Sequence, residues 1–445
     1  MKKTLLLTLA TGLATALPLM ADTDIYITGS TAFRANVHDA CKNLFSPAPA
    51  EITGTSLTGG DSKTGSKAAQ WVMTGTPIAG LTQISGTLTI HALFTGSVQG
   101  MQTVENGTKL FFLDKAGNKI SNTPTIAFSD ASSLSTTYPA DGINFQEENV
   151  AVQPFVICKA VTSSSALANV TGLNSEQYKY AIQAGRIPLS AWTGKTSDHS
   201  TYIYNLERTK DSGTRRVGFA CVGDGFNASA AIYNLDVTNN VMYHPTTANA
   251  AASLGGTGFG VVGGAGNGNA NLNWGPGYVG GGDVSTALGT NLSANVSIGI
   301  LSIADAKGIS GSLAANNWTQ VIPFNGIWPT AAGSGIAGNA GTNDYTPITE
   351  GVYSLWGYEV VVYPISTAGL NISSANDQDV TLAQLGDQNT AGTFLGVLDN
   401  QTLTPTPVVG SLVNEIVNSQ PGGATAIPIG LMTSGRTSVG GTITP

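Results

Sequence analysis

A basic residue and three small hydrogen-bond donors lie close together in residues 207–215. Arg208 is followed, four positions later, by the Ser-Gly-Thr triplet Ser212–Thr214. A guanidinium donates paired, charged hydrogen bonds to a tetrahedral oxyanion. The hydroxyls and amides of a Ser-Gly-Thr turn that begins a helix donate to the same kind of group. Because the apolar, strand-like run Tyr202–Leu206 comes just before, the sequence predicts anion binding at the end of a strand.

Three earlier segments have the same layout, in which an apolar strand ends in small polar residues. Asp24–Ala32 ends in Gly-Ser-Thr-Ala, His91–Ser97 ends in Thr-Gly-Ser, and Thr125–Asp130 ends in Ser-Asp. Ligands of open α/β sheets bind just outside the carboxyl ends of the strands, so we expect the four segments to meet in one cleft. The residues expected to contact the ligand are Ser30, Thr31, Ala32, Ser97, Asp130, Arg208, Ser212, Gly213 and Thr214.

Each of these residues also has an ordinary structural interpretation. Asp130 follows a strand, where Asp is commonly a helix N-cap. Arg208 has neighbours, Glu207 and Asp211, with which it could form a surface ion pair. The serines are suited to capping helices. The occurrence of four such segments favours a binding site over these alternatives.

The four segments, in this order, resemble the periplasmic phosphate-binding protein of bacterial ABC phosphate importers. That family has a Gly-Ser-Thr opening, a Gly-Ser-x-x-Gly helix start, a Ser-Asp-Ala strand end and an Arg-x-x-x-Ser-Gly-Thr loop. The resemblance extends from about Gly29 to Tyr358. Its further landmarks are Asn174–Trp192, Ser297–Ala306, Gly326–Pro329 and Gly351–Leu355.

The resemblance implies a type II periplasmic binding protein, which is an α/β fold of two lobes with mixed sheets flanked by helices and a ligand cleft between the lobes. Lobe I would comprise residues 22–152 and 326–445, lobe II residues 153–325, and the strand Val150–Ile157 would cross between them. It implies a monomeric, non-enzymatic protein without cofactor that passes inorganic phosphate to an ABC-transporter permease. The Gly-rich composition leaves an alternative, a cell-surface or matrix protein with the same fold that binds another oxyanion or nothing.

Asp130 is the residue expected to select the ligand. A carboxylate can only accept hydrogen bonds, so it accepts the proton of hydrogen phosphate and repels sulfate, which has none to give. A site that leaves the wrong ligand with an unpaired or repelling group discriminates strongly.

One departure from the family pattern concerns the orientation of Arg208. The acidic residue that the family often has two positions after this arginine is replaced by Lys210, so another group must orient the guanidinium. Arg34, Arg215 and Arg216 are additional cations near the loops. They either raise the local positive potential or are solvated surface charges, and we favour the second interpretation for Arg216.

The first 21 residues and the charge balance indicate export. Met1–Ala21 has two lysines, a Leu-rich apolar run and a small final residue, as a cleaved signal peptide does. Without those lysines, the 19 basic residues become 17 against 27 acidic ones, a net charge of −10, which argues against nucleic acid. No later segment has the roughly 18 apolar residues of a membrane span. We therefore expect a periplasmic or extracellular protein.

The cysteines and histidines offer little for catalysis. Cys41, Cys158 and Cys221 allow at most one disulfide, and the apolar runs around Cys158 and Cys221 favour buried thiols over a bridge between them. The four histidines have no spacing that suits a metal site or a Cys–His pair.

Glycine-rich stretches are expected to be surface loops. They cover residues 52–80, 253–282 and 331–346, and the second contains a G-x-G-x-x-G pattern from Gly258 to Gly263. A dinucleotide site needs a strand before and a helix after that pattern, and glycines continue on both sides. The tail from Ala391 has an amphipathic patch at 408–417, suited either to covering a lobe or to binding a partner.

Overall fold

The structure is a computed structural model. It describes residues 22–54, 65, 68–79, 86–136, 145–162, 164–225, 228–236, 239–244, 259–260, 277–306, 309, 320–331, 345–364, 426–427, 432–436 and 443–444. Four sequence-based predictions therefore lie wholly or mostly outside the described residues: the signal peptide, the stretch 253–282 with its G-x-G-x-x-G pattern, the loop 331–346 and the patch 408–417.

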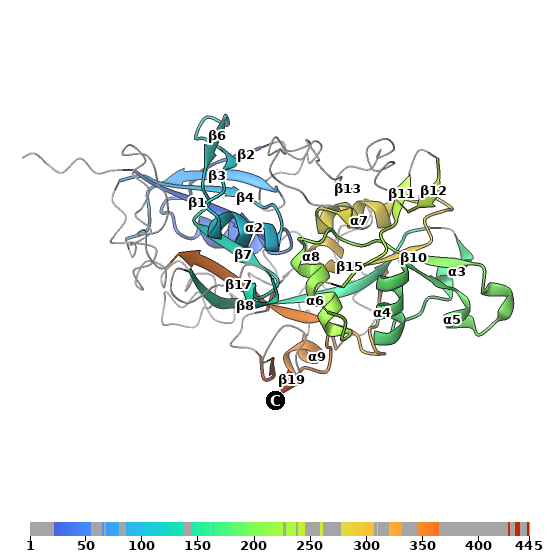
Figure 1. The fold of residues 1–445 in the computed structure, drawn as a ribbon. Coiled ribbons are helices and arrows are strands. Elements are labelled where there is room, and N and C mark those ends of the chain that lie inside the picture. Colours follow the sequence, from blue (N-terminus) through green and yellow to red (C-terminus); the bar gives the residue numbers. More distant parts are fainter. Residues whose placement is uncertain are drawn as a thin grey trace, which may run out of the picture.

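The chain forms two lobes joined by long strands (Figure 1). The first lobe contains β1 (Thr23–Gly29), α1 (Arg34–Lys42), β2 (Ala50–Thr53), β3 (Gln70–Gly75), β4 (Leu88–Leu93), α2 (Ser97–Glu105), β5 (Leu110–Leu113), β6 (Lys119–Asn122) and β7 (Ile126–Ser129). The second contains α3 (Ser165–Ala168), α4 (Ser175–Ala184), β9 (Arg186–Pro188), α5 (Ser190–Thr193), β10 (Tyr202–Asn205), α6 (Gly213–Cys221), β11 (Asn234–Asp236), β12 (Val241–Tyr243), β13 (Phe259–Gly260), β14 (Gly277–Tyr278), α7 (Gly281–Gly289), β15 (Ser297–Ser302), α8 (Ile303–Ala306) and β16 (Val321–Ile322). The joining strands are β8 (Phe145–Lys159) and β17 (Trp356–Pro364).

One mixed sheet runs through both lobes. Over the described residues it has 11 strands in the order β2-β3-β4-β1-β7-β17-β8-β15-β10-β9, with β16 beside β8. β1 pairs in parallel with β4 and β7, and β10 pairs in parallel with β15. Every residue of β4 and β15 is buried, as expected of strands covered on both faces. The two-lobed, mixed α/β fold expected from the sequence is confirmed.

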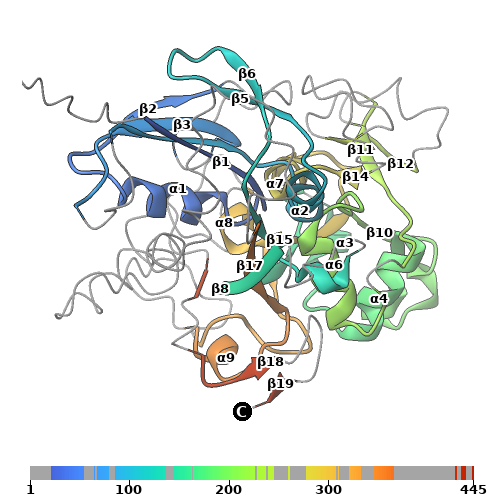
Figure 2. The same cartoon turned by 60° about the vertical axis from the view of Figure 1, so that its left-hand side comes forward.

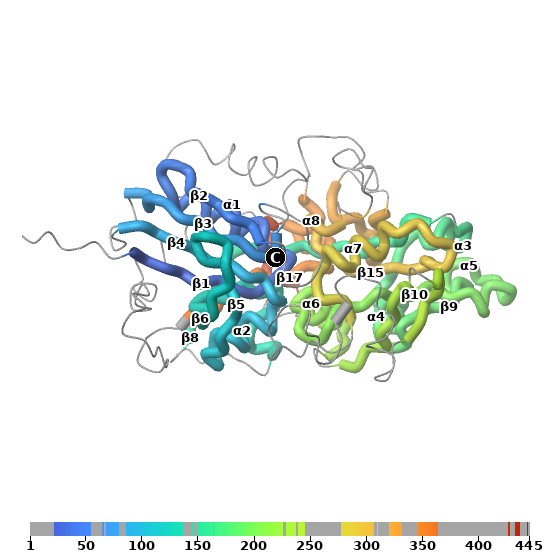
Figure 3. The backbone as a smooth tube through the Cα atoms, turned by 90° about the horizontal axis from the view of Figure 1, so that it is seen from above, coloured from blue at the N-terminus to red at the C-terminus, as the bar shows by residue number. Residues whose placement is uncertain are grey.

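The strand predicted to cross between the lobes does so. β8 pairs with β17 from Phe145 to Pro154 and with β15 from Phe155 to Lys159. β17 also pairs with β7 of the first lobe. From above, β17 lies between the two groups of elements (Figure 3). The apolar run Tyr358–Tyr363 forms most of β17.

Elements from late in the chain cover the crossing strands. α9 (Thr346–Thr349), β18 (Gly435–Arg436) and β19 (Ile443–Thr444) lie together beside β8 and β17 (Figure 2). Ile427 exchanges two backbone hydrogen bonds of 2.8 Å with Val152 of β8. The described part of the tail therefore packs onto the protein's own central strands.

The prediction of a loop throughout residues 52–80 is wrong. β3 pairs with β4 along all six of its residues, and its Trp71 is 0% exposed in the core of the first lobe. The apolar part of β3 is short and has Gly- and Ser-rich neighbours, so its periodicity is weak. Packing of the indole against the sheet outweighs that local composition.

Two further features of the described residues concern membrane-spanning helices and the cysteines. No helix in the described ranges combines the length and apolar character that crossing a bilayer requires. The three cysteines are free, with Cys41 and Cys158 buried and Cys221 partly buried. Burial raises the pKa of all three thiols, so they are held in the unreactive protonated form.

Candidate functional site

The four segments singled out in the sequence converge between the lobes. The loops after β1, β4 and β7 supply residues 30–32, 97 and 130 from the first lobe, and the loop after β10 supplies residues 208–214 from the second. α6 and α8 lie on the side of the second lobe that faces the first (Figures 1 and 3). The predicted site residues are buried. We call Ser30, Thr31, Ala32, Ser97, Asp130, Arg208, Ser212, Gly213 and Thr214 the interlobe cluster.

Asp130 is the acceptor at the centre of the cluster. Its carboxylate is 2% exposed and accepts from the Ser30 hydroxyl on one oxygen. The other oxygen accepts from Thr214 Oγ1 at 2.9 Å, a hydrogen bond that joins the lobes. Asp130 caps no helix here, because the short helix that follows is capped by Ser132. The alternative interpretation of Asp130 as a helix N-cap is wrong.

Arg208 is buried rather than on the surface, so the alternative of a surface ion pair is also wrong. Its side chain is 2% exposed. Nε donates to the Tyr278 carbonyl at 3.1 Å, and Nη2 donates to the Val279 carbonyl at 2.7 Å and to Thr31 Oγ1 at 3.3 Å. Two backbone carbonyls therefore orient the guanidinium in place of the acidic residue that Lys210 replaces. Burial lowers the pKa of Arg208, and nearby carboxylates, Asp305 first, oppose that shift.

The Ser-Gly-Thr triplet begins α6, as predicted. Ser212 is the N-cap and accepts from the Arg215 amide at 3.3 Å. Gly213 lies so close to the first lobe that a Cβ there would stand 2.5 Å from Ser97 Oγ and 2.9 Å from Asp130 Cβ. Only glycine fits this contact without displacing a neighbour. The N-terminus of α6 is thus pressed against the first lobe.

The turn after β1 depends on another glycine. Gly29 has φ of 120°, and a Cβ there would be 2.0 Å from the Phe128 carbonyl oxygen of β7. The following Ser30 Oγ accepts from the amides of Ala32 and Phe33, both at 3.1 Å. Ser97 Oγ accepts from the Asp130 amide at 3.3 Å. These contacts fix the polar groups of the first lobe relative to one another.

The additional arginines have structural partners. Arg216 is 7% exposed and donates to the Ser135 carbonyl at 2.6 Å, so its interpretation as a solvated surface charge is wrong. Arg215 donates to the Arg208 carbonyl at 3.0 Å. Arg34 of α1 forms an ion pair of 3.5 Å with Asp305 of α8, across the lobes.

Two buried carboxyl groups near the cluster were missed by sequence reasoning. Asp305 holds Arg34 and accepts from Ser302 Oγ at 2.9 Å. Glu359 is 0% exposed inside β17. The signal for Glu359 was a single acidic residue in the apolar run Tyr358–Tyr363. Asp305 also follows an apolar run, Ile298–Ile303, but its sequence neighbours do not show that it pairs with Arg34 of the other lobe.

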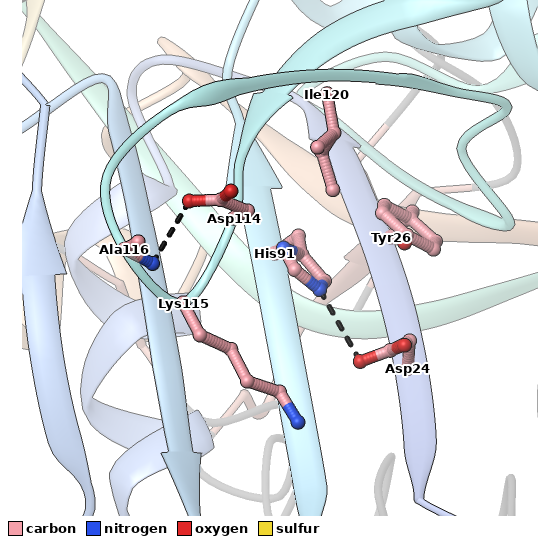
Figure 4. Close-up of a pocket in the computed structure, with 7 residues that line it drawn as sticks. All are labelled: Asp24, Tyr26, His91, Asp114, Lys115, Ala116 and Ile120. Atoms are coloured by element: carbon pink, nitrogen blue, oxygen red, sulfur yellow. Dashed lines mark hydrogen bonds and ion pairs between the residues drawn. The ribbon is translucent and has the colours of Figure 1, made fainter.

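A pocket of about 320 Å³ in the first lobe is lined by residues outside the interlobe cluster (Figure 4). His91 and Tyr26 stack in it with ring centroids 4.6 Å apart. The His91 ring nitrogens contact the Leu113 carbonyl at 2.6 Å and Asp24 at 3.4 Å. The polar groups of this pocket therefore have partners within the fold, and none belongs to the cluster. Across the described ranges, no group of three or more His, Cys, Asp or Glu is placed to hold a metal ion.

Comparisons with known proteins bear on the fold. No protein-family model matches the sequence, and no curated protein matches it. A putative phosphate ABC transporter substrate-binding protein of Clostridium perfringens, solved with bound phosphate, is 11% identical with a TM-score of 0.44, over 92% of this chain and 100% of that one. An ABC-type phosphate transport receptor of Vibrio cholerae is 13% identical with a TM-score of 0.39, over 91% and 99%. A possible phosphate-binding protein of Planctomyces limnophilus is 9% identical with a TM-score of 0.38, over 92% and 95%. Such distant likeness assigns neither ligand nor site residue to this chain.

Proposed function

We propose that the protein is an exported, non-enzymatic solute-binding protein that captures inorganic phosphate between its lobes for an ABC importer. The observation that carries the proposal is the interlobe cluster, in which Asp130 and Arg208 come from opposite lobes and are both buried among hydroxyl groups. The ligand would bind through the nine residues of the cluster. The lobes would comprise residues 22–152 with 326–445, and 153–325. We further propose a monomer in the periplasm or outside the cell.

The chemistry of the cluster fits a protonated oxyanion. Removing a dianion from water is costly unless its oxygens meet donors. Arg208 supplies a positive charge, and Thr31, Ser97 and Thr214 supply hydroxyls. Asp130 supplies an acceptor, which suits the proton of hydrogen phosphate and opposes sulfate. Donors alone would bind both anions, so the carboxylate gives the cluster its selectivity.

Calorimetric titration tests this function. The purified protein is stripped of carried-over ligand by partial unfolding and dialysis, and is then titrated with phosphate, arsenate and sulfate. Phosphate is expected to bind, with sulfate weaker by at least about a hundredfold, which corresponds to about 2.7 kcal/mol. Binding of sulfate with equal affinity would contradict the role of Asp130. No heat with any of the three would favour the alternative of a surface or matrix protein that shares the fold.

A further inference from the structure

Glu359 is a carboxyl group in the middle of the sheet that connects the lobes. It lies in β17 between Tyr358 and Val360, and its side chain is 0% exposed. Neither of its carboxyl oxygens has a partner of normal hydrogen-bond geometry in the structure. An ionised carboxylate in that position would bear a large desolvation penalty with nothing to offset it. The burial of Glu359 therefore raises the question of whether its carboxyl group carries a proton in the folded protein.

The strand register brings Glu359 close to Asp130. In the antiparallel pair of β17 and β7, Val360 lies opposite Ser129 and Val361 opposite Phe128. Glu359 and Asp130 are the next residues beyond this pair, just past the end of β7, where the register of β17 with β8 shifts between Glu359 and Val360. Gly357 confirms the proximity, because a Cβ there would be 3.2 Å from the Asp130 carbonyl oxygen.

The charges around Glu359 oppose its ionisation. Burial raises its pKa, and the neighbouring Asp130 raises it further. Elements packed against β17 carry other charged groups. One of them, Glu105, is the last residue of α2 and lies at the opposite end of that helix from Ser97. The others whose side chains are described have partners of their own. Glu147 accepts from the Ser133 amide, Arg215 donates to the Arg208 carbonyl, and Arg216 donates to the Ser135 carbonyl. Lys159 donates to the Leu167 and Val170 carbonyls, and Arg436 donates to the Ser354 carbonyl.

We propose that Glu359 is a neutral carboxylic acid that faces Asp130 and positions it as the single charged carboxylate of the interlobe cluster. An ionised carboxylate has about four acceptor sites. Ser30 and Thr214 each donate to Asp130, and the Glu359 proton fills a third site. One site then remains for a proton of the ligand. This consequence for phosphate rests on the proposed function, whereas the protonation of Glu359 does not.

Denaturant unfolding without phosphate, at pH 6, 7 and 8, tests the protonation. Glutamate in an unfolded chain is ionised at these pH values, since its pKa is about 4.3. The native wild type keeps the proton, so unfolding releases one, and rising pH favours the unfolded state. Relative to Glu359→Gln, which has no proton to lose, the folding equilibrium constant of the wild type is expected to fall about tenfold per pH unit. If the ratio of the wild-type folding constant to that of Glu359→Gln stays the same from pH 6 to pH 8, the proposal is overturned.

Two further variants complete the test. Glu359→Leu removes the same ionisable group and is expected to reproduce the tenfold change per pH unit if Glu359→Gln fails to fold. Glu176→Gln makes the same chemical change on the exposed first turn of α4, and there the ratio is expected to stay constant. A pH-dependent ratio for Glu176→Gln as well would assign the effect to the substitution type rather than to Glu359.

Phosphate titration of the same variants tests the positioning role. Gln keeps an N–H donor toward Asp130 and is expected to hold the phosphate affinity within about threefold at pH 6.5. Leu donates nothing and is expected to lower the affinity about tenfold, a typical value for one hydrogen bond to a charged group. Equal affinities for Gln and Leu would contradict positioning. If even the wild type binds no phosphate, the proposed function fails, and the unfolding data still decide the state of Glu359.

Discussion

At the scale of single residues, Asp130 combines two roles that are separable by experiment. It accepts hydrogen bonds from Ser30 within its own lobe and from Thr214 of the other lobe. In the proposed function it also accepts the proton of the ligand. The first role affects stability and lobe closure, and the second affects the choice of anion.

Replacing Asp130 with alanine is expected to remove the choice of anion. Phosphate affinity should fall roughly ten- to a hundredfold, because a charged hydrogen bond worth about 1.5–3 kcal/mol is lost. Sulfate affinity should rise or stay constant, because the repelling carboxylate is gone, so the phosphate-to-sulfate ratio collapses. Titration with both anions measures the ratio, and the melting temperature of the same variant reports the structural role. A lower melting temperature with an unchanged ratio would mean that Asp130 is structural only.

The residue types near the site could be predicted from the sequence, but their surroundings could not. Ser212 was expected to cap a helix and does so, because capping depends on a few neighbouring residues. Arg216 was expected in solvent and is buried, because its partner, the Ser135 carbonyl, is 81 residues away in the chain. The surroundings of Glu359 were missed, since only the pairing of β17 with β7 brings it near the end of β7. Distant contacts decide which polar residues are buried, and local patterns do not record them.

At the scale of elements, the start of α6 packs directly against the first lobe. Ser212 and Thr214 flank Gly213, whose missing side chain lets the helix end reach Ser97 and Asp130. The same helix end carries the partial positive charge of a helix N-terminus. Its position therefore matters for both closure and anion binding.

A methyl group at Gly213 is expected to hold the lobes apart. In Gly213→Ala the new Cβ would stand 2.5 Å from Ser97 Oγ, so α6 must retreat and Thr214 loses contact with Asp130. We expect phosphate affinity to fall at least about tenfold, with a smaller effect on the melting temperature of the unliganded protein. Gly225→Ala is the matched control, because a Cβ there meets nothing within 4 Å. Equal binding by both variants would contradict the close approach.

The elements themselves were predicted best where an apolar strand runs into a capped helix. β1, β4, β7 and β10 end where the sequence places their ends, within a residue or two. β3 was missed because its apolar run is short, and its stability comes from β4 and the Trp71 contacts. The order of strands in the sheet, with β17 between β7 and β8, follows from pairing alone.

At the scale of the whole molecule, several polar contacts between described residues join the lobes, among them the bond from the Val98 amide to the Asp211 carbonyl at 3.1 Å and that from Arg216 to the Ser135 carbonyl. Arg208 donates to Thr31, Thr214 donates to Asp130, and Arg34 pairs with Asp305. The ion pair is shielded, with side-chain exposures of 13% and 5%. Removing one partner of a shielded pair leaves an uncompensated charge, and this costs more than losing an exposed pair, whose median worth is about 0–1 kcal/mol.

Removing the Arg34 cation is expected to shift the molecule toward an open arrangement. Arg34→Gln breaks the 3.5 Å pair with Asp305 and leaves that carboxylate partly buried, which disfavours closure. Small-angle scattering should show a larger radius of gyration without phosphate, and titration should show an affinity lower by about tenfold. Lys115→Gln breaks an exposed pair of 3.0 Å with Asp22 within the first lobe and should change neither quantity. An unchanged radius for Arg34→Gln would mean that this pair does not contribute to closure.

The position of β17 in the sheet has a consequence for how the chain acquires its structure. β17 comes from residues 356–364, about four-fifths of the way along the sequence, yet it lies between β7 and β8 at the centre of the sheet. Contacts between residues so far apart in the sequence form slowly. On a ribosome, the pairs of β17 with β7 and with the first part of β8 cannot form until this late strand has emerged. The edges of β7 and of the first part of β8 that face β17 therefore stay unpaired until almost the whole chain has been made.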